Sequence, residues 1–329
     1  SRGLGDVYKR QQVSIFSELN NINNISMQPE YAGLCGITKD EVENELQIDI
    51  ASLAERLGKT YDETLEAITT NYDGYHFTWP SPDVFNPFSL LAAFTNGNLV
   101  PYWFSTGTPT YLLEMMRKFD VLPSDLSKIE ARKFEFDAPT ENMTSLTPLL
   151  YQSGYLTIKD YDADFEVYTL DLPNREIRIG LFQNLLPNYL AFGQSGAVTI
   201  AKIARFIRND DMNGALQLLQ SFLSTVPYCN VKNYEGHYQQ MLYVIFTLLT
   251  EYMVDVEVHT PHGRIDMVLM TRTRIYLLEL KLNKDAQTAM QQINLKHYRE
   301  RFSLSPLPVT KVGVNFDSEK GNITDWVIE

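Results

Sequence analysis

The stretch GRIDMVLMTRTRIYLLELK, residues 263–281, limits what the chain can fold into more than any other segment. Two runs rich in isoleucine, valine, leucine and tyrosine flank a polar centre, TRTR, and such runs favour β-strands. The centre is not an Asn-Gly or Asp-Gly pair, which would specify a tight turn, but it is polar enough to reverse the chain. The segment therefore predicts an antiparallel β-hairpin.

This hairpin would bring charged residues together in apolar surroundings. A symmetric hairpin pairs Met270 with Ile275 next to the turn. Counted outward, it pairs Asp266 with Glu279, and directly opposed residues lie about 4.5–5.5 Å apart at Cβ. Lys281 shares their face because strand side chains alternate. Both faces are otherwise apolar, which is typical of an interior strand covered on both sides.

Two interpretations of these charges are open. Opposed carboxylates repel each other, and an unpaired buried charge is costly. A bound divalent cation would resolve the conflict, because hard cations prefer carboxylate oxygens. Asp266 and Glu279 would then be metal ligands, and Lys281 would place a positive donor beside an attacked phosphate. In the alternative, the three residues form a half-buried ion-pair trio in which Lys281 only neutralises the two acids.

Composition and hydropathy indicate a globular chain of one large or two ordinary domains, with 329 residues, 44% hydrophobic and 21% charged. The longest apolar run, residues 241–253, is interrupted by Glu251 and is shorter than the roughly 18 residues of a membrane span. Cys35 and Cys229 match no metal-binding spacing. We therefore expect a cytoplasmic protein without a membrane segment.

Charge is unevenly distributed along the chain. The net charge is −13, yet residues 229–329 carry 11 basic and 12 acidic residues, a net of −1, which leaves −12 for the first 228. Residues 272–301 hold seven bases and three acids. This run predicts either a basic surface that guides a nucleic-acid backbone or an ordinary solvated helix face. The candidate nucleic-acid-binding residues are Arg272, Arg274, Lys284 and Arg299.

The N-terminal third reads as helical. Residues 1–11, SRGLGDVYKRQ, lack periodicity and resemble a translated linker, so we expect them to be non-native. Thr38 with Glu41, and Thr60 with Glu63, have the spacing of capping boxes at helix starts. Gly58 is a candidate helix end. We expect a mainly helical region over residues 12–135.

The rest of the chain divides into two further parts. Residues 136–228 predict a winged-helix-like unit with short strands, followed by helices, with a boundary near 227–232. Residues 229–329 predict a helix (235–253), a strand (254–260), the hairpin, a helix (284–302) and a last strand (308–316). The crossover helix makes that last strand parallel to its neighbour in a mixed sheet flanked by helices.

The order αβββαβ, with the pattern Asp-x12-Glu-x-Lys ending at Lys281, resembles the PD-(D/E)XK nuclease superfamily. The segments YDGYHF, FNPFSLL and YWFSTGTPTYLL are similar to the later part of an AAA-ATPase-like region, which in one bacterial family precedes a C-terminal PD-(D/E)XK domain. The resemblance implies a restriction-endonuclease-like α/β domain behind the end of an ATPase-like region. The chain would then be a fragment of a longer protein.

The resemblance also implies site residues. Asp266 and Glu279 correspond to ligands of Mg²⁺ or Mn²⁺, and Lys281 to the lysine that orients water or stabilises charge on the phosphate. Glu235 corresponds to a further acid on the first helix, although a helix N-terminus favours an acid in any case. Gln292 corresponds to a helix glutamine near the site, or is an ordinary exposed glutamine.

The sequence ERLGKT contains Gly58-Lys59-Thr60 but is not a P-loop, because Leu53 stands where that motif needs glycine and a helix is expected before it. We expect no ATP hydrolysis by that route. The expected function is metal-dependent phosphodiester hydrolysis of nucleic acid, with DNA favoured over RNA. The alternative is a non-cleaving module that binds nucleic acid or a partner within a larger ATPase system. A homo-oligomer is compatible with the sequence.

Overall fold

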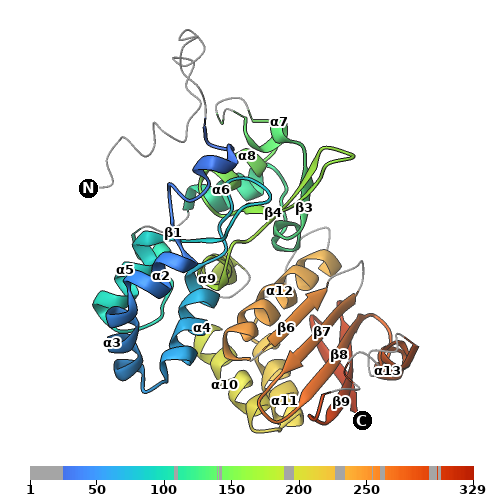
Figure 1. Ribbon diagram of the computed structural model, residues 1–329. Coiled ribbons are helices and arrows are strands. Elements are labelled where there is room, and N and C mark those ends of the chain that lie inside the picture. The colour runs from blue at the N-terminus through green and yellow to red at the C-terminus, as the bar shows by residue number, and fades with distance from the viewer. Residues whose placement is uncertain are drawn as a thin grey trace. The chain divides into compact units, whose positions relative to one another are not determined.

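The computed structural model is shown in Figure 1. It describes residues 25–106, 110–138, 140, 143–188, 196–226, 234–253, 255–259, 264–295, 302 and 305–329. The chain divides into two compact units, Ser1–Leu181 and Phe182–Glu329. Helix α9 (Arg175–Leu185) contains the point of division. The expected linker at residues 1–11 lies outside the described residues.

Several helices of the N-terminal unit begin or end at the signals that the sequence predicts. They are α2 (Lys39–Glu45), α3 (Gln47–Leu57), α4 (Tyr61–Tyr72), α5 (Pro87–Asn96), α6 (Thr110–Lys118), α7 (Lys133–Phe136) and α8 (Thr147–Gln152). Both capping boxes are confirmed, Thr38 with Glu41 and Thr60 with Glu63. Gly58 ends α3 at φ 63°, in the left-handed region that favours glycine. The Gly-Lys-Thr sequence therefore follows a helix, whereas a P-loop follows a strand. This agrees with its rejection as a P-loop.

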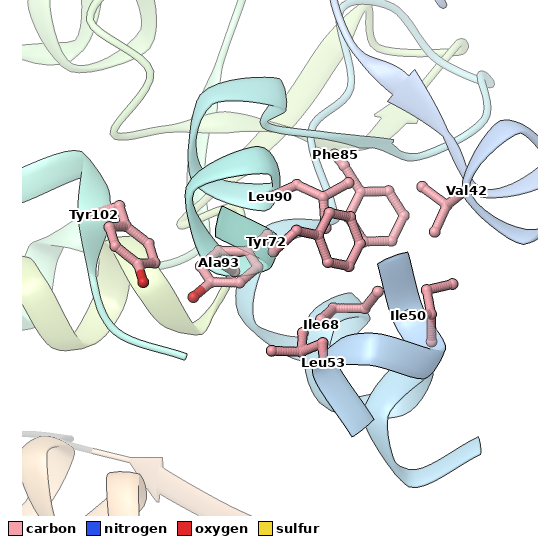
Figure 2. Packing of buried hydrophobic residues seen from close by; sticks show 10 residues of the cluster. Val42, Ile50, Leu53, Ile68, Tyr72, Phe85, Leu90, Ala93 and Tyr102 are labelled. Atoms are coloured by element: carbon pink, nitrogen blue, oxygen red, sulfur yellow. The ribbon is translucent and has the colours of Figure 1, made fainter. Parts of the chain in front are cut away.

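Helices α2 to α5 enclose the core of this unit (Figure 2). Ile50 and Leu53 of α3 face Ile68 and Tyr72 of α4, and each of these side chains is 0% exposed. The periodic apolar positions of each helix thus meet on one side, as expected for amphipathic helices. Two short strands, β1 (Ile37–Thr38) and β2 (Val84–Phe85), pair antiparallel beside them.

A second, three-stranded sheet with the order β3-β5-β4 completes the unit. Strands β4 (Thr157–Asp162) and β5 (Val167–Asp171) are present as expected, but residues 148–152, which the sequence favoured as the start of the first strand, belong to helix α8. The sequence did not predict β3 (Ile129–Ala131), because three residues are too few for a periodic signal. The winged-helix-like interpretation of this part stays a prediction.

The C-terminal unit is built on a five-stranded sheet with the order β10-β9-β8-β7-β6. The strands are β6 (Asp255–His259), β7 (Arg264–Met270), β8 (Ile275–Leu282), β9 (Val309–Asp317) and β10 (Asn322–Ile328). The hairpin register is confirmed, with Met270 opposite Ile275 and Asp266 opposite Glu279. The predicted parallel pairing of the last crossover strand is also confirmed, between β8 and β9. The sequence prediction missed β10, which pairs antiparallel with β9.

Helices cover both faces of this sheet (Figure 1). Met290 and Ile293 of α13 (Ala286–Leu295) pack against Val268 and Leu277 on one face. Helix α12 (Tyr234–Leu249) lies on the other face, where the ring of Tyr238 is 5.2 Å from that of Phe316. The mixed sheet with flanking helices agrees with the expected C-terminal domain.

Helices α10 (Gly196–Arg208) and α11 (Met212–Leu223) belong to the same compact unit as the sheet. Trp326 Nε1 of β10 donates to Asn213 Oδ1 of α11 at 2.9 Å. Gln220 of α11 donates to the carbonyl oxygen of Ile323 at 2.7 Å. The predicted boundary near 227–232 falls outside the described residues. Among the described helices, none is long and apolar enough to cross a membrane.

Candidate active site

Two rows of residues cross the sheet on the face that α13 covers. In the first row Asp266, Glu279 and Gly313 are direct register partners on β7, β8 and β9. The second row, two residues along each strand, consists of Arg264, Lys281, Asn315 and Asp325. Because side chains alternate along a strand, the described members of both rows face the same way. The predicted motif residues thus occupy neighbouring register positions, although the side chains of Arg264 and Asp266 lie outside the described part of the chain.

Glu279 is a carboxylate buried inside the domain and paired with a lysine. Its exposed fraction is 0%, and its Oε1 lies 2.8 Å from Lys281 Nζ. The two-residue spacing along β8 puts both side chains on one face. A buried charge requires such a partner, because transfer from water is otherwise very unfavourable. The pair fixes the position of both charged groups.

Helix α13 supplies a third member of this cluster. Lys281 Nζ donates to Gln292 Oε1 at 3.2 Å, across 11 residues of sequence. Gln292 is half-buried, so it is not an ordinary exposed glutamine. The structure therefore brings together three of the five residues expected at the catalytic site: Glu279, Lys281 and Gln292.

Gly313 allows α13 to approach the sheet beside Glu279. A Cβ atom at Gly313 would lie 2.5 Å from the carbonyl oxygen of Ala286 and 2.8 Å from the backbone nitrogen of Met290. Real Cβ contacts are not that short, so only glycine fits under the helix backbone. Sequence reasoning missed this residue, although a glycine within a β-strand is a signal of close backbone approach.

Glu235 belongs to α12, and its side chain is outside the described part of the chain. Tyr238, three residues further along the helix, packs on Phe316. Phe316 pairs with Leu282, which follows Lys281 in β8. The start of α12 therefore lies at the same end of the sheet as Lys281, and a catalytic role for Glu235 stays a prediction.

The basic residues of the hairpin turn lie away from this cluster. Arg272 is exposed, whereas Arg274 has its Nε 3.4 Å from Asp210 Oδ1 and donates through Nη1 to Thr310 Oγ1 at 2.8 Å. Five residues separate Arg274 from Glu279, which corresponds to about 16 Å along a strand. The structure does not bring these arginines to Glu279, and any role for them in binding nucleic acid stays a prediction.

The remaining two basic candidates differ. Lys284 is exposed and follows Lys281 by three residues, so it lies at the cluster end of β8. Arg299 lies outside the described residues. Of the four basic candidates, only Lys284 is placed near the cluster.

Asp210 holds the opposite end of the hairpin and was not predicted. Its Oδ1 accepts hydrogen bonds from Thr273 Oγ1 at 3.2 Å and from the Tyr276 hydroxyl at 3.0 Å. Burial, followed by this hydrogen bond, raises the pKa of Tyr276 above its ordinary value. The contacts join residues more than 60 positions apart, so no local sequence pattern reveals them.

The donor set fits a hard divalent cation. Asp266 and Glu279 are opposed in register, and carboxylate oxygens are the ligands that Mg²⁺ and Mn²⁺ prefer. Among the described side chains, no group of three histidines, cysteines or acids forms a further metal cluster. Asp266 and Glu279 stay the residues predicted to hold a metal.

Comparison with known proteins identifies the family of the C-terminal part of the chain. Residues 233–326 match the family model of the PD-(D/E)XK nuclease superfamily. An uncharacterized protein in the vnfD 5' region of Azotobacter chroococcum mcd 1 is 31% identical over 335 residues, which cover 99% of this chain and 62% of that protein. The chain thus spans less than two thirds of this relative's length. No solved structure matches. The family match does not reach residues 12–135, whose ATPase-like resemblance stays a prediction.

Proposed function

Because residues 233–326 are a PD-(D/E)XK nuclease superfamily domain, we propose that this protein hydrolyses phosphodiester bonds of nucleic acid, with DNA as the expected substrate. The observation that carries the proposal is the buried Glu279 carboxylate, 2.8 Å from Lys281 Nζ and opposite Asp266 in register. A structural hairpin gains nothing from opposing a second acid to a buried glutamate. A site that binds a cation does gain from it.

Asp266 and Glu279 would hold a divalent cation, Mg²⁺ or Mn²⁺. When bound, the cation supplies polarisation of the phosphate and a lowered pKa of an attacking water. Glu279 contributes a carboxylate that stays close to Lys281 and is shielded from solvent. Asp266 contributes the facing position on β7. Glu235, at the start of α12, is a further acid proposed for this end of the sheet.

Lys281 would stabilise negative charge on the phosphate. Its ammonium group has three N–H donors. Glu279 and Gln292 hold the nitrogen at 2.8 Å and 3.2 Å. The remaining donor is the one that we assign to the phosphate oxygen that gains charge. Gln292 thereby acts as the group that orients the lysine.

The test is cleavage of labelled single- and double-stranded DNA and RNA with Mg²⁺, Mn²⁺ or EDTA. Asp266→Ala and Lys281→Ala should each lower the rate by roughly a hundredfold to a thousandfold, because each removes a charge acting on the reacting phosphate. Lys202→Ala, which changes an exposed lysine of α10 in the same unit, is the matched control and should cut at the parent rate.

Two results would contradict the proposal. Cleavage that persists in EDTA and in both variants would come from a contaminant or another site. No cleavage of any substrate, together with no rise in melting temperature on adding Mn²⁺, would make the trio a structural ion pair and the domain a binding module.

A further inference from the structure

We propose that Asn315 is a positioning residue for Lys281, an inference that rests on the proposed nuclease function. Asn315 is the register partner of Lys281 across the parallel β8–β9 pair. It lies on the same face of the sheet and is only 7% exposed. A buried side-chain amide needs hydrogen-bond partners, and these partners indicate what the residue holds in place.

Both ends of the Asn315 amide have partners. Its Oδ1 accepts from the backbone N–H of Lys284 at 3.0 Å. Its Nδ2 donates to Thr324 Oγ1 on β10 at 2.7 Å. The amide cannot rotate without losing one of the two bonds, so its orientation is fixed. Asn315 therefore ties the connection that follows β8 to the far side of the sheet.

The neighbouring residue of this connection is tied in the same way. Asn283 adopts a left-handed conformation with φ 57° and donates its N–H to the carbonyl oxygen of Phe316 at 2.8 Å. Its Oδ1 accepts from the backbone nitrogen of Ser318 at 2.8 Å and from the Ser318 hydroxyl at 3.0 Å. Two successive residues between β8 and α13 are thus fixed to the end of β9.

The start of α13 is fixed by the same row of residues. The N–H of Ala286 donates to Asp325 Oδ2 at 3.0 Å, and Asp325 is the register partner of Asn315 on β10. Gln292 lies six residues further, about 9 Å along the helix. The helix start therefore determines where Gln292 meets Lys281 Nζ.

These hydrogen bonds connect Asn315 to Lys281 through the start of α13 and Gln292. Lys281 is held by Glu279 within its own strand and by Gln292 from α13. Loss of the Asn315 amide frees the connection at Lys284 and allows α13 to shift against the sheet. A small shift of a catalytic group lowers the rate far more than it lowers stability. Asn315 touches neither the metal positions nor the phosphate in this scheme.

The test measures kcat, KM and metal affinity of the full chain. Asn315→Ala should lower kcat by about tenfold to a hundredfold, as is usual for residues that orient catalytic groups, with KM and metal affinity nearly unchanged. Asn213→Ala is the matched control, since it removes another asparagine that contacts β10, through Trp326, away from the cluster. It should retain the parent kcat.

A double-mutant cycle separates positioning from general stability. If Asn315 acts through α13, the loss caused by Asn315→Ala should shrink in a Gln292→Ala background. Thr324→Val, which removes the acceptor of the Asn315 NH2 group together with the hydroxyl that donates to Asp325 Oδ1, should lower kcat in the same direction. Thr324→Ser should restore it. This pair keeps the inference testable if Asn315→Ala fails to fold.

Three outcomes would overturn the inference. An active parent with an undiminished Asn315→Ala kcat would reject the inference and leave the nuclease function standing. Fully additive losses in the cycle would make Asn315 a stabilising residue only. A parent chain that cleaves no nucleic acid would reject the proposed function, and the positioning role with it.

Discussion

Among the described residues two glutamates are buried, one in each compact unit, and they have opposite surroundings. Glu176 of α9 is 1% exposed, and its Oε1 accepts the backbone N–H of Trp103 at 2.8 Å. Burial raises its pKa from 4.5 to about 7, against hydrogen bonds that lower it. Glu279 is 0% exposed but has the Lys281 ammonium at 2.8 Å. Burial without a cation thus raises the pKa of Glu176, whereas the buried Glu279 has a cation in direct contact.

The difference between their partners favours Glu279, and not Glu176, as the acid of a catalytic site. Glu176 accepts from the backbone of Trp103 in the 3-10 helix η3 (Tyr102–Thr106), and its raised pKa leaves it only partly ionised near neutral pH. Glu279 combines a charged partner, an opposed acidic position and a glutamine on a second element. Perturbed acids cluster at functional sites, yet structural acids are perturbed as well. The partners of an acid, more than its burial, distinguish the two cases.

Lys281→Met should have the largest effect on stability. It leaves the Glu279 carboxylate buried without its cation, and breaking a buried pair costs roughly 3–5 kcal/mol of unfolding free energy. Urea unfolding of the variant and the parent measures the loss, and hydrogen exchange of the β8 amides locates it. The double variant Glu279→Gln, Lys281→Met should recover most of the loss; no recovery would mean that the lysine acts through packing.

Glu176→Gln should stabilise the N-terminal unit at high pH. The folded pKa of about 7 lies above the unfolded value near 4.5, so the wild-type folded state loses stability as pH rises between those values. The glutamine removes that loss, which amounts to about 3 kcal/mol at most above pH 7. Below pH 4.5 the variant and the parent should be equal. Denaturation curves at pH 4 and pH 8 test this.

Glu55→Gln is the control for that measurement, since it changes an exposed acid of α3 in the same unit. It should alter stability little at either pH. An equal gain from both variants at pH 8 would attribute the effect to net charge and would remove the contrast between Glu176 and Glu279.

Gly313→Ala should produce the smallest change in stability and a larger one in activity. The added Cβ meets backbone atoms of α13, which cannot move independently, so the helix must lift from the sheet. Overpacking of this kind costs about 1–3 kcal/mol. Gly33→Ala, where the nearest atom is 3.5 Å away, should cost less. An active Gly313→Ala chain would show that the α13 position is not critical to the site.

Local patterns predicted the part of the site that lies within one hairpin. The pairing of Asp266 with Glu279 follows from counting outward from a turn, and the parallel strand follows from a crossover helix. Both capping boxes are likewise contained within four residues. The hairpin and the capping boxes join residues close in sequence, and the parallel pairing follows from the crossover helix between its strands, so a pattern in the sequence predicts each of them.

Contacts between distant segments could not be predicted in this way. Strand β10 completes the sheet, and helix α11 packs against it. Their contacts join distant residues such as Trp326 and Asn213, which are 113 residues apart. The bond from Asn315 to Lys284 spans 31 residues, and either residue alone reads as an ordinary polar position. A glutamate such as Glu176 likewise carries no local sign that it is buried. These features depend on how elements pack, which no short window contains.

The clamp at Asp210 has a consequence for motion. Asp210 binds Thr273 in the β7–β8 turn and Tyr276 beside it, so this end of the hairpin is tied to the connection between α10 and α11. Asp266 and Glu279 stand four residues from the two strand ends beside that turn, on arms of equal length. Each arm is also paired with a further strand, β7 with β6 and β8 with β9, so the hairpin is held along its length as well as at its turn. A cation bound between Asp266 and Glu279, as proposed, would therefore meet two backbone positions whose separation is fixed from three sides.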